Sequence, residues 1–159
     1  MVTFTSREVV FYTRANWQGK SARQSISREE ALDRHARRQP YGVSLNDDDG
    51  RIDIDILFGE TYCEVCFLDH MGREDLAYAF EERDGRLFLF QATYTMYDEN
   101  ETRVKRREIY YFQPNGYVRI MEGNPGQRPS VRDKTTDVTR NWSDLPNFND
   151  VVALARRER

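Results

Sequence analysis

The two cysteines are the first residues whose type and spacing could support chemistry. Cys63 and Cys66 form a Cys-Glu-Val-Cys motif, a spacing found in redox-active and zinc-binding pairs. Residues 61–68 are β-prone, however, and side chains three apart on a strand point to opposite faces, so the two sulfur atoms should diverge. Zinc would need two further ligands, and His35 and His70 are the only histidines. We predict buried structural cysteines, no metal and no cofactor, with metal and redox roles as the less favoured alternatives.

Neither histidine has a sequence context typical of a catalytic base. His70 directly follows Asp69 in a predicted loop, but adjacency in a loop does not supply the geometry of a catalytic pair. The chain has no Gly-rich phosphate loop after a strand, no paired histidine–glutamate helix and no Gly-x-Ser-x-Gly elbow. The sequence therefore predicts no catalytic residue and favours a protein that is not an enzyme.

Five aspartates gather around a predicted acidic turn. Asp47, Asp48 and Asp49 precede Gly50, and the polar side of the next predicted strand carries two more. The spacing lacks the frame of an EF-hand calcium loop, and a solvated turn is the simplest interpretation. The alternative is an acidic patch that contacts a protein partner. This predicted partner-binding set is Asp47, Asp48, Asp49, Asp53 and Asp55.

Basic residues alternate along the predicted strand 102–112. Arg103, Lys105 and Arg107 share one side of it, with Tyr111 further along and Arg119 on the next strand. Basic and aromatic side chains on a sheet can bind single-stranded nucleic acid. The net charge of -3 argues against that, and pairing with carboxylates on neighbouring strands explains the arginines without a ligand. Nucleic acid is therefore a disfavoured partner.

The longest apolar and aromatic stretch spans residues 86–97. In an extended chain Phe88, Phe90 and Tyr94 fall on one side, together with residues 92 and 96. A curled sheet could use such a ridge to line a cavity for a small apolar molecule. The predicted lining is Tyr78, Phe80, Phe88, Phe90 and Tyr94. The same side chains would equally fill a core, which is the favoured interpretation because packed interiors are the default.

Hydrophobic alternation places these residues on successive strands. In residues 51–58 the isoleucines and Phe58 should point inward, and Arg51, Asp53 and Asp55 toward water. Similar segments follow at 61–68, 75–81, 86–97, 102–112 and 117–121, separated by short Gly, Asp or Asn turns. Short connections require antiparallel neighbours, so we predict a meander of six strands, with residues 8–13 as a candidate seventh.

The sequence predicts one helix near each end of the chain. Ser27 and Glu30 match a capping box for a helix at 28–38, which Pro40 would end. Residues 123–149 look like an irregular wrap, and Asn149 or Asp150 could cap a last helix at 151–157. The expected fold is α+β: one domain, residues 1–159, with a single curved antiparallel sheet that can form a half-barrel, and one helix near each terminus. Whether the sheet closes into a barrel is left open.

Bulk properties narrow the class of protein further. A chain of 159 residues is about one domain long, and with 38% hydrophobic residues it has no run of the roughly 20 apolar residues that span a bilayer. The first residues lack the basic and apolar parts of a leader, so we expect a cytoplasmic protein without a membrane partner. The scarcity of lysine among the 24 basic residues suggests a GC-rich bacterial genome. The oligomeric state is left open.

Residues 110–118, Tyr-Tyr-Phe-Gln-Pro-Asn-Gly-Tyr-Val, resemble strand–turn–strand stretches in immunity proteins of bacterial polymorphic-toxin systems. The resemblance implies inhibition of a cognate toxin by covering its active site. Aromatic residues make up 13% of the chain, and together with arginine they are enriched at interface centres. Non-catalytic protein binding is thus the favoured function. A calycin-like barrel that binds a small apolar ligand is the alternative, and an enzyme of unknown class is third.

Overall fold

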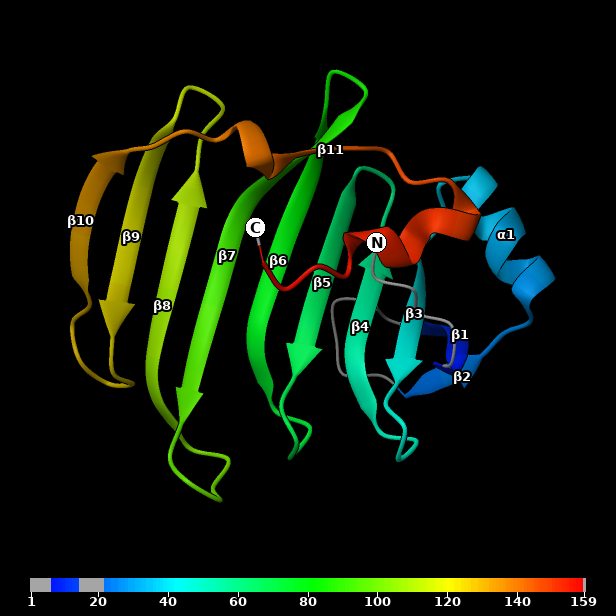
Figure 1. The fold of residues 1–159 in the computed structure, drawn as a ribbon, viewed down its shortest axis with the longest axis horizontal. Coiled ribbons are helices and arrows are strands. Elements are labelled where there is room, and N and C mark those ends of the chain that lie inside the picture. Colours follow the sequence, from blue (N-terminus) through cyan, green and yellow to red (C-terminus); the bar gives the residue numbers. More distant parts are fainter. Residues whose placement is uncertain (1–6, 15–21, 159) are drawn as a thin grey trace.

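In the computed structural model, which describes residues 7–14 and 22–158, the strands form one antiparallel sheet (Figure 1). The strands are β1 Val9–Arg14, β2 Arg23–Ser25, β3 Tyr41–Asn46, β4 Ile52–Phe58, β5 Tyr62–Leu68, β6 Glu74–Arg83, β7 Arg86–Tyr97, β8 Val104–Phe112, β9 Tyr117–Gly123, β10 Ser130–Thr135 and β11 Trp142–Asp144. The helical elements are α1 Arg28–Ala36 and the 3₁₀ helices η1 Thr139–Asn141 and η2 Phe148–Leu154. The N-terminal residues that bear on a leader lie outside the described part of the chain.

The sheet is a continuous meander from β3 to β10, extended beyond β3 by β1 and then β2. β11 pairs with the start of β7, where Trp142 lies opposite Phe88, while β8 pairs with the same strand from Gln91 onward. The order leaves β10 and β2 at the two ends, so the sheet is open. The antiparallel meander and the α+β class are confirmed.

The predicted number of six to seven strands is wrong, because the described residues form eleven. β3 does alternate, with Tyr41, Val43 and Leu45 on the core side, but Gly42 and Asn46 between and after them are residue types that strands disfavour. All six residues of β10 are exposed and mostly polar, and β2 and β11 are only three residues long, so these three strands lack the alternating pattern that identifies a half-buried strand.

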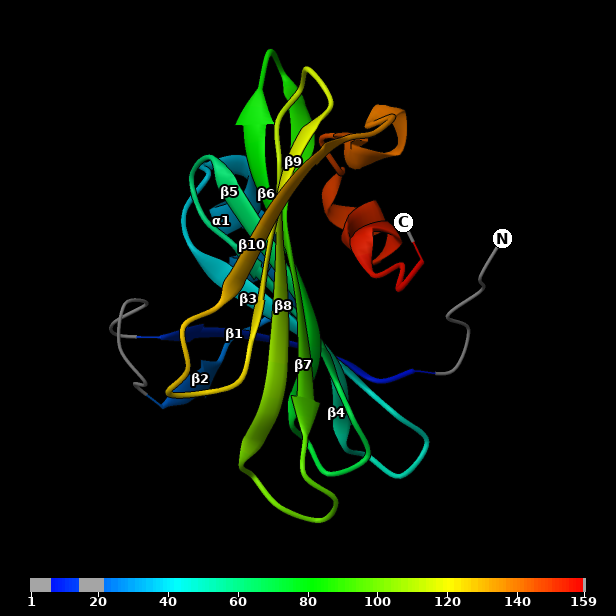
Figure 2. The ribbon, with the colours of Figure 1, turned by 90° about the vertical axis from the view of Figure 1, so that its left-hand side faces the viewer.

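One side of the sheet, here called the core face, carries the hydrophobic core. A cross-strand row runs along it through Val43, Ile56, Val65, Tyr78 and Ala92 on β3 to β7. The C-terminal segment, residues 136–158, lies over this face (Figures 1 and 2). From η2 it contributes buried Phe148, Val151 and Leu154, and α1 contributes Ala31. Burying the apolar side of a helical element against a sheet is what closes the core.

The two helical elements follow the sequence only in part. The capping box at Ser27 is confirmed, since the Glu30 amide donates to Ser27 Oγ (3.1 Å), but α1 ends at Ala36. The last helix is a 3₁₀ helix that starts earlier than predicted, at Phe148, and its N-cap Asn147 makes no side-chain capping bond. Asn149 instead accepts a hydrogen bond from Arg28 (2.6 Å). The early start brings Phe148 into the core.

A β-bulge in β7 changes which aromatic side chains share a face. Ala79 lies opposite Gln91, but the next residue, Phe80, lies opposite Leu89, so Phe90 is the extra residue. Leu87 and Leu89 therefore point to the core face, and Phe88 points to the opposite face. The prediction of a single ridge from Phe88 to residue 96 is wrong for this reason, because alternation reverses at the bulge.

The ring of Tyr12 on β1 lies across the backbone of Gly42 on β3: a Cβ on this glycine would come within 2.1 Å of Tyr12 Cζ. Tyr12 is buried there and its neighbour on β1, Phe11, faces the core.

No helix within the described residues has the length and apolar character needed to cross a bilayer.

Replacing Gly42 with alanine should lower the free energy of unfolding by about 1–3 kcal/mol, because the new methyl group displaces the Tyr12 ring. The matched control is Gly59→Ala, whose Cβ would meet its nearest neighbour at 3.6 Å, an ordinary contact. Urea unfolding of both variants measures the difference. Equal stabilities would mean that the ring does not hold this position.

Candidate functional site: an aromatic groove beside the C-terminal segment

The core face continues beyond the part that η2 covers, and there it forms a groove. The groove has a volume of about 430 Å³ and lies between β7, β8 and residues 134–141. Its floor consists of Tyr78, Leu89, Ala92, Tyr94, Tyr110 and Phe112, and its rim of Glu108, Lys134, Thr136, Asp137, Arg140 and Asn141. A concave site of this size with an apolar floor and a few polar groups is typical of ligand sites.

Three aromatic rings in a row form the exposed part of the floor. Tyr94 is 41% exposed and meets Tyr110 edge to face, with ring centroids 5.7 Å apart. Tyr110 in turn stacks with Phe112 at 6.3 Å. Tyr78 lies deeper, and its hydroxyl donates to the Arg157 carbonyl oxygen (2.6 Å), which ties the end of the chain to β6. The groove thus offers ring faces and edges to an occupant.

Glu108 and Tyr110 are held in place by their neighbours. The Tyr110 hydroxyl donates to Glu108 Oε2 (3.0 Å), and Arg106 donates to Glu108 Oε1 (2.8 Å). Burial, followed by the hydrogen bond to Glu108, raises the pKa of Tyr110 above its ordinary value, so the phenol stays neutral. The carboxylate of Glu108 thus pairs with Arg106, which it shares with Glu122 (2.5 Å).

The rim carries two cationic side chains, Lys134 from β10 and Arg140 from η1. Neither forms an ion pair with a carboxylate anywhere in the described part of the chain. The nearby Asp137 is occupied by Thr139, whose hydroxyl (2.6 Å) and amide (2.9 Å) both donate to it, and these bonds lower the pKa of Asp137. Asn141 fixes η1 to β7 by donating to the Leu89 carbonyl oxygen (3.0 Å). An occupant with an apolar body and a negative group fits this arrangement.

The groove brings together two of the five aromatic residues predicted to line a cavity. Tyr78 and Tyr94 line it, whereas Phe80 is fully buried in the core. Phe88 packs on the opposite face against Trp142, with ring centroids 4.8 Å apart. Phe90, the bulge residue, lies near Tyr62 at 6.3 Å. Three residues therefore leave the predicted set: Phe80 because it is fully buried in the core, and Phe88 and Phe90 because of the bulge.

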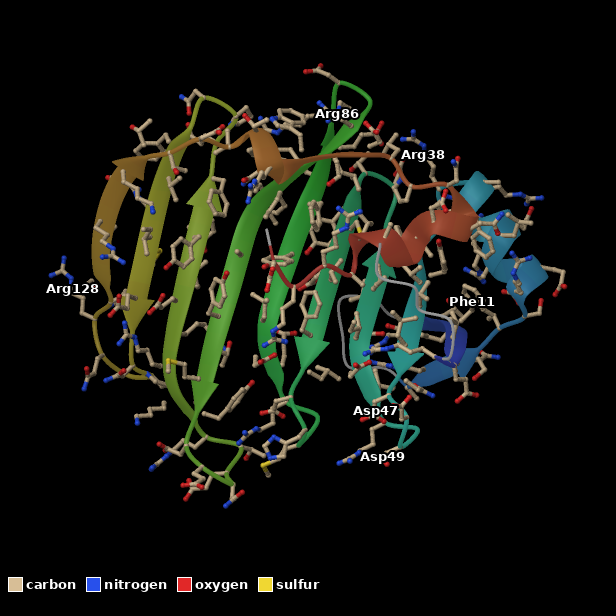
Figure 3. All side chains as sticks on the ribbon, viewed as in Figure 1. Phe11, Arg38, Asp47, Asp49, Arg86 and Arg128 are labelled. Atoms are coloured by element: carbon tan, nitrogen blue, oxygen red, sulfur yellow. The ribbon has the colours of Figure 1, made fainter. Side chains whose placement is uncertain are left out.

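The predicted acidic patch is divided into an exposed turn and two paired carboxylates. Asp47 and Asp49 lie at the tip of the β3–β4 hairpin, as Figure 3 shows. Asp47 accepts from the amides of Asp49 (3.0 Å) and Arg51 (2.8 Å), and Asp49 pairs with the Arg51 guanidinium (2.9 Å). Asp48 is exposed in the same turn. Asp53, on the strand β4 that follows the turn, is paired with the Arg7 guanidinium (2.6 Å).

Asp55, the last of the five, is only 5% exposed, so the prediction that it faces water is wrong. Its carboxylate accepts hydrogen bonds from the Tyr12 hydroxyl (2.8 Å), Ser44 Oγ (2.9 Å) and the Arg23 guanidinium (2.9 Å). Arg23 also stacks over the Tyr12 ring at 4.6 Å. This buried network joins β1, β2, β3 and β4, because a buried carboxylate must be fully hydrogen-bonded. The alternation of residues 51–58 gave no sign of it.

His35 is a structural residue that holds the C-terminal segment. Its Nε2 lies 3.1 Å from the Pro146 carbonyl oxygen, which can only accept, so Nε2 carries the proton and Nδ1 accepts from the Tyr41 hydroxyl (2.8 Å). Both ring nitrogens are thus engaged, and the ring packs edge to face against Phe58. Burial lowers the pKa of His35 below its ordinary value. His70 lies exposed in the β5–β6 turn.

The cysteines lie as their spacing predicts. Cys63 points into the core and Cys66 to the opposite face of β5, and both are free and buried. In the described ranges no group of three or more His, Cys, Asp or Glu side chains is placed to hold a metal ion. Of the alternating basic residues, Arg103 pairs with Asp98 (2.7 Å) and Arg119 with Asp133 (3.0 Å).

Sequence reasoning missed the polar half of the groove, namely Glu108, Lys134 and Arg140. One signal was present: residues 108, 110 and 112 alternate on one side of their strand, which places Glu108 beside Tyr110 and Phe112. No comparable signal marks Lys134 or Arg140, because they come from a fully exposed strand and a single 3₁₀ turn.

The stability of the protein should fall as the pH is lowered from about 7.5 to about 5.5, in part because of His35. The unfolded chain binds a proton at the ordinary histidine pKa and the folded chain only at a lower one, so protonation favours unfolding in this window. His35→Gln should be less stable at neutral pH and show a weaker pH dependence, whereas His70→Gln should keep the original slope. Urea unfolding at several pH values tests this. A His35→Gln slope equal to that of the unmodified chain would contradict it.

The site is defined by these contacts alone. Comparison of the chain with protein-family models, with curated proteins and with solved structures finds no match.

Proposed function

We propose that the chain is a non-catalytic protein-binding domain that receives part of a partner protein in the aromatic groove. The observation that carries this proposal is the open row of Tyr94, Tyr110 and Phe112 beside two unpaired cations. Exposed aromatic side chains flanked by arginine are the residues that contribute most to binding energy at protein interfaces.

The rim selects the charge of what enters. Lys134 and Arg140 would attract a partner segment that carries a carboxylate next to an apolar or aromatic side chain. The turn of Asp47, Asp48 and Asp49 remains our proposed acidic contact for a basic part of the partner. Asp53 and Asp55 do not belong to that contact, because their side chains are only 27% and 8% exposed and are held by Arg7 and Arg23. Asp49 also pairs with an arginine, Arg51, but its side chain is 75% exposed and stays open to a partner.

An immunity protein is the partner-binding role that we favour. Residues 110–118, which resemble stretches of immunity proteins, supply Tyr110 and Phe112 of the groove and the turn that follows it. In this role the chain would act in the cytoplasm and inhibit a cognate bacterial toxin by covering its active site. Tight association by preformed contacts would be enough, and no chemical step by this chain is needed.

Binding of a small apolar ligand is the second candidate. It is favoured by the volume of the groove, about 430 Å³, and by the presence of Tyr78 and Tyr94 in its lining. The ligand would lie in the open groove, since the sheet is not closed into a barrel. Native mass spectrometry of freshly purified protein distinguishes the two, because a retained ligand adds mass to the folded chain.

The test of the proposed function uses a toxin domain encoded by a neighbouring gene, co-expressed with this chain. Co-expression should restore growth, and the purified pair should form a complex. Tyr94→Ala and Arg140→Glu should each weaken the complex by about tenfold or more, the effect expected of central interface residues, measured by calorimetry. The matched control is Met96→Ala, which removes a 54% exposed side chain from the same strand and face outside the groove.

Two results would overturn this proposal. Equal affinities of Tyr94→Ala, Arg140→Glu and Met96→Ala would show that the groove does not bind the toxin. The absence of a toxin gene nearby, together with no growth rescue, would remove the immunity role.

A further inference from the structure

The outer edge of β10 is a second surface with the features of a binding site. β10 is the last strand of the sheet, it pairs only with β9, and all six of its residues are exposed. In Figure 1 it forms the left margin of the molecule, with no other described element beside it. An unpaired edge of this length is a template to which another strand can add.

The hydrogen-bonding pattern shows which backbone groups are available. The amide of Thr136 donates to the Gly116 carbonyl oxygen (2.9 Å), so position 136 faces β9. Backbone groups alternate in direction along an antiparallel strand. Ser130, Arg132 and Lys134 therefore direct their amide and carbonyl groups to β9, and Val131, Asp133 and Thr135 direct theirs outward.

The side chains along this edge are charged in a pattern. Arg132 and Lys134 point to the core face, opposite Ile120 and Val118 of β9, and neither forms an ion pair with any carboxylate that the structure describes. On the other face Asp133 is already paired with Arg119 (3.0 Å). A strand added to β10 would thus meet two free cations at alternate positions on the core-face side and no free charge on the other.

A second copy of this chain is a poor occupant of the edge. Opposed residues of an antiparallel pair share a face, so the two registers of fullest overlap are centred on Arg132 or on Asp133. The first register places Arg132 opposite its own copy, and the second places Arg132 opposite Lys134 and Asp133 opposite itself. Like charges directly opposite destabilise a strand pair. The other sheet edge, β2, has only three residues.

We propose that β10 receives an extended segment of a partner protein whose carboxylates, at alternate positions, lie opposite Arg132 and Lys134. The proposal rests on the proposed function only in that the chain binds a protein, and it does not require the groove. The added strand would extend the sheet past β10, with main-chain hydrogen bonds supplying affinity and the two carboxylates supplying register.

The test uses a short synthetic peptide with Glu at alternate positions separated by Thr and Val, and a control peptide with Lys in place of Glu. The acidic peptide should bind, and hydrogen exchange followed by NMR should show new protection of the Val131, Asp133 and Thr135 amides. The variant Arg132→Glu, which leaves the groove residue Lys134 unchanged, should lose about tenfold in affinity for the acidic peptide and bind the Lys peptide better than the unmodified chain does.

A backbone variant separates strand addition from simple charge attraction. Val131→Pro removes one outward N–H without removing a bond to β9 and should weaken binding of the acidic peptide, whereas Val131→Thr, which keeps the N–H, should not. If Val131→Pro fails to fold, a peptide N-methylated on the amides that face β10 tests the same bond from the other side. Circular dichroism checks the fold of each variant.

The proposal is wrong if both peptides bind equally, if the N-methylated peptide binds as well as the unmodified one, or if the outward amides gain no protection. Protection of these amides that grows with protein concentration alone, without peptide, would instead identify a second copy as the occupant. Tyr94→Ala should bind the acidic peptide normally. A failure of the groove and a failure of the edge are therefore distinguishable.

Discussion

The structure depends on how a wide, single-layered sheet covers its apolar face. The core face spans the strands from β3 to β9, but the covering segment provides only η2, η1 and the residues around them. It is held by the His35 bond to the Pro146 carbonyl oxygen, the Tyr78 bond to the Arg157 carbonyl oxygen and the Asn141 bond to the Leu89 carbonyl oxygen. Where this cover stops, the sheet shows aromatic side chains, and the groove is the direct result.

The central strands could be predicted from the sequence because half-buried strands alternate. β4 to β9 all carry this pattern, and short turns fix them as an antiparallel meander. β10 could not be found in the same way, since all of its residues are exposed and periodicity reports a difference between two faces. β3 does alternate, with Tyr41, Val43 and Leu45 on one side, but Gly42 and Asn46 are residue types that strands disfavour, and they obscured it.

The site was less predictable because it depends on contacts between distant residues. The single extra residue at Phe90 reversed the faces of Phe88 and Phe90, and no local feature of the stretch 86–97 marks the bulge. Asp55 reads as a solvent-facing residue until Arg23, Tyr12 and Ser44 come together around it. The cations of the groove, Lys134 and Arg140, lie on β10 and η1, which have no pattern of their own in the sequence. The strands could therefore be predicted from local sequence, whereas the groove depends on the tertiary structure.

The divided edge of β7 has a consequence for how the chain reaches its final form. β8 covers one part of that edge and β11 the other, and the residues that pair between β7 and β11 lie far apart in the sequence, from 54 positions for Phe88 and Trp142 to 58 for Arg86 and Asp144. During synthesis on the ribosome, the meander can therefore assemble while the start of β7 still lacks a neighbour. Maturation ends only when the final segment emerges and docks, so a nascent chain that stalls before Trp142 would expose Phe88 to chaperones and proteases.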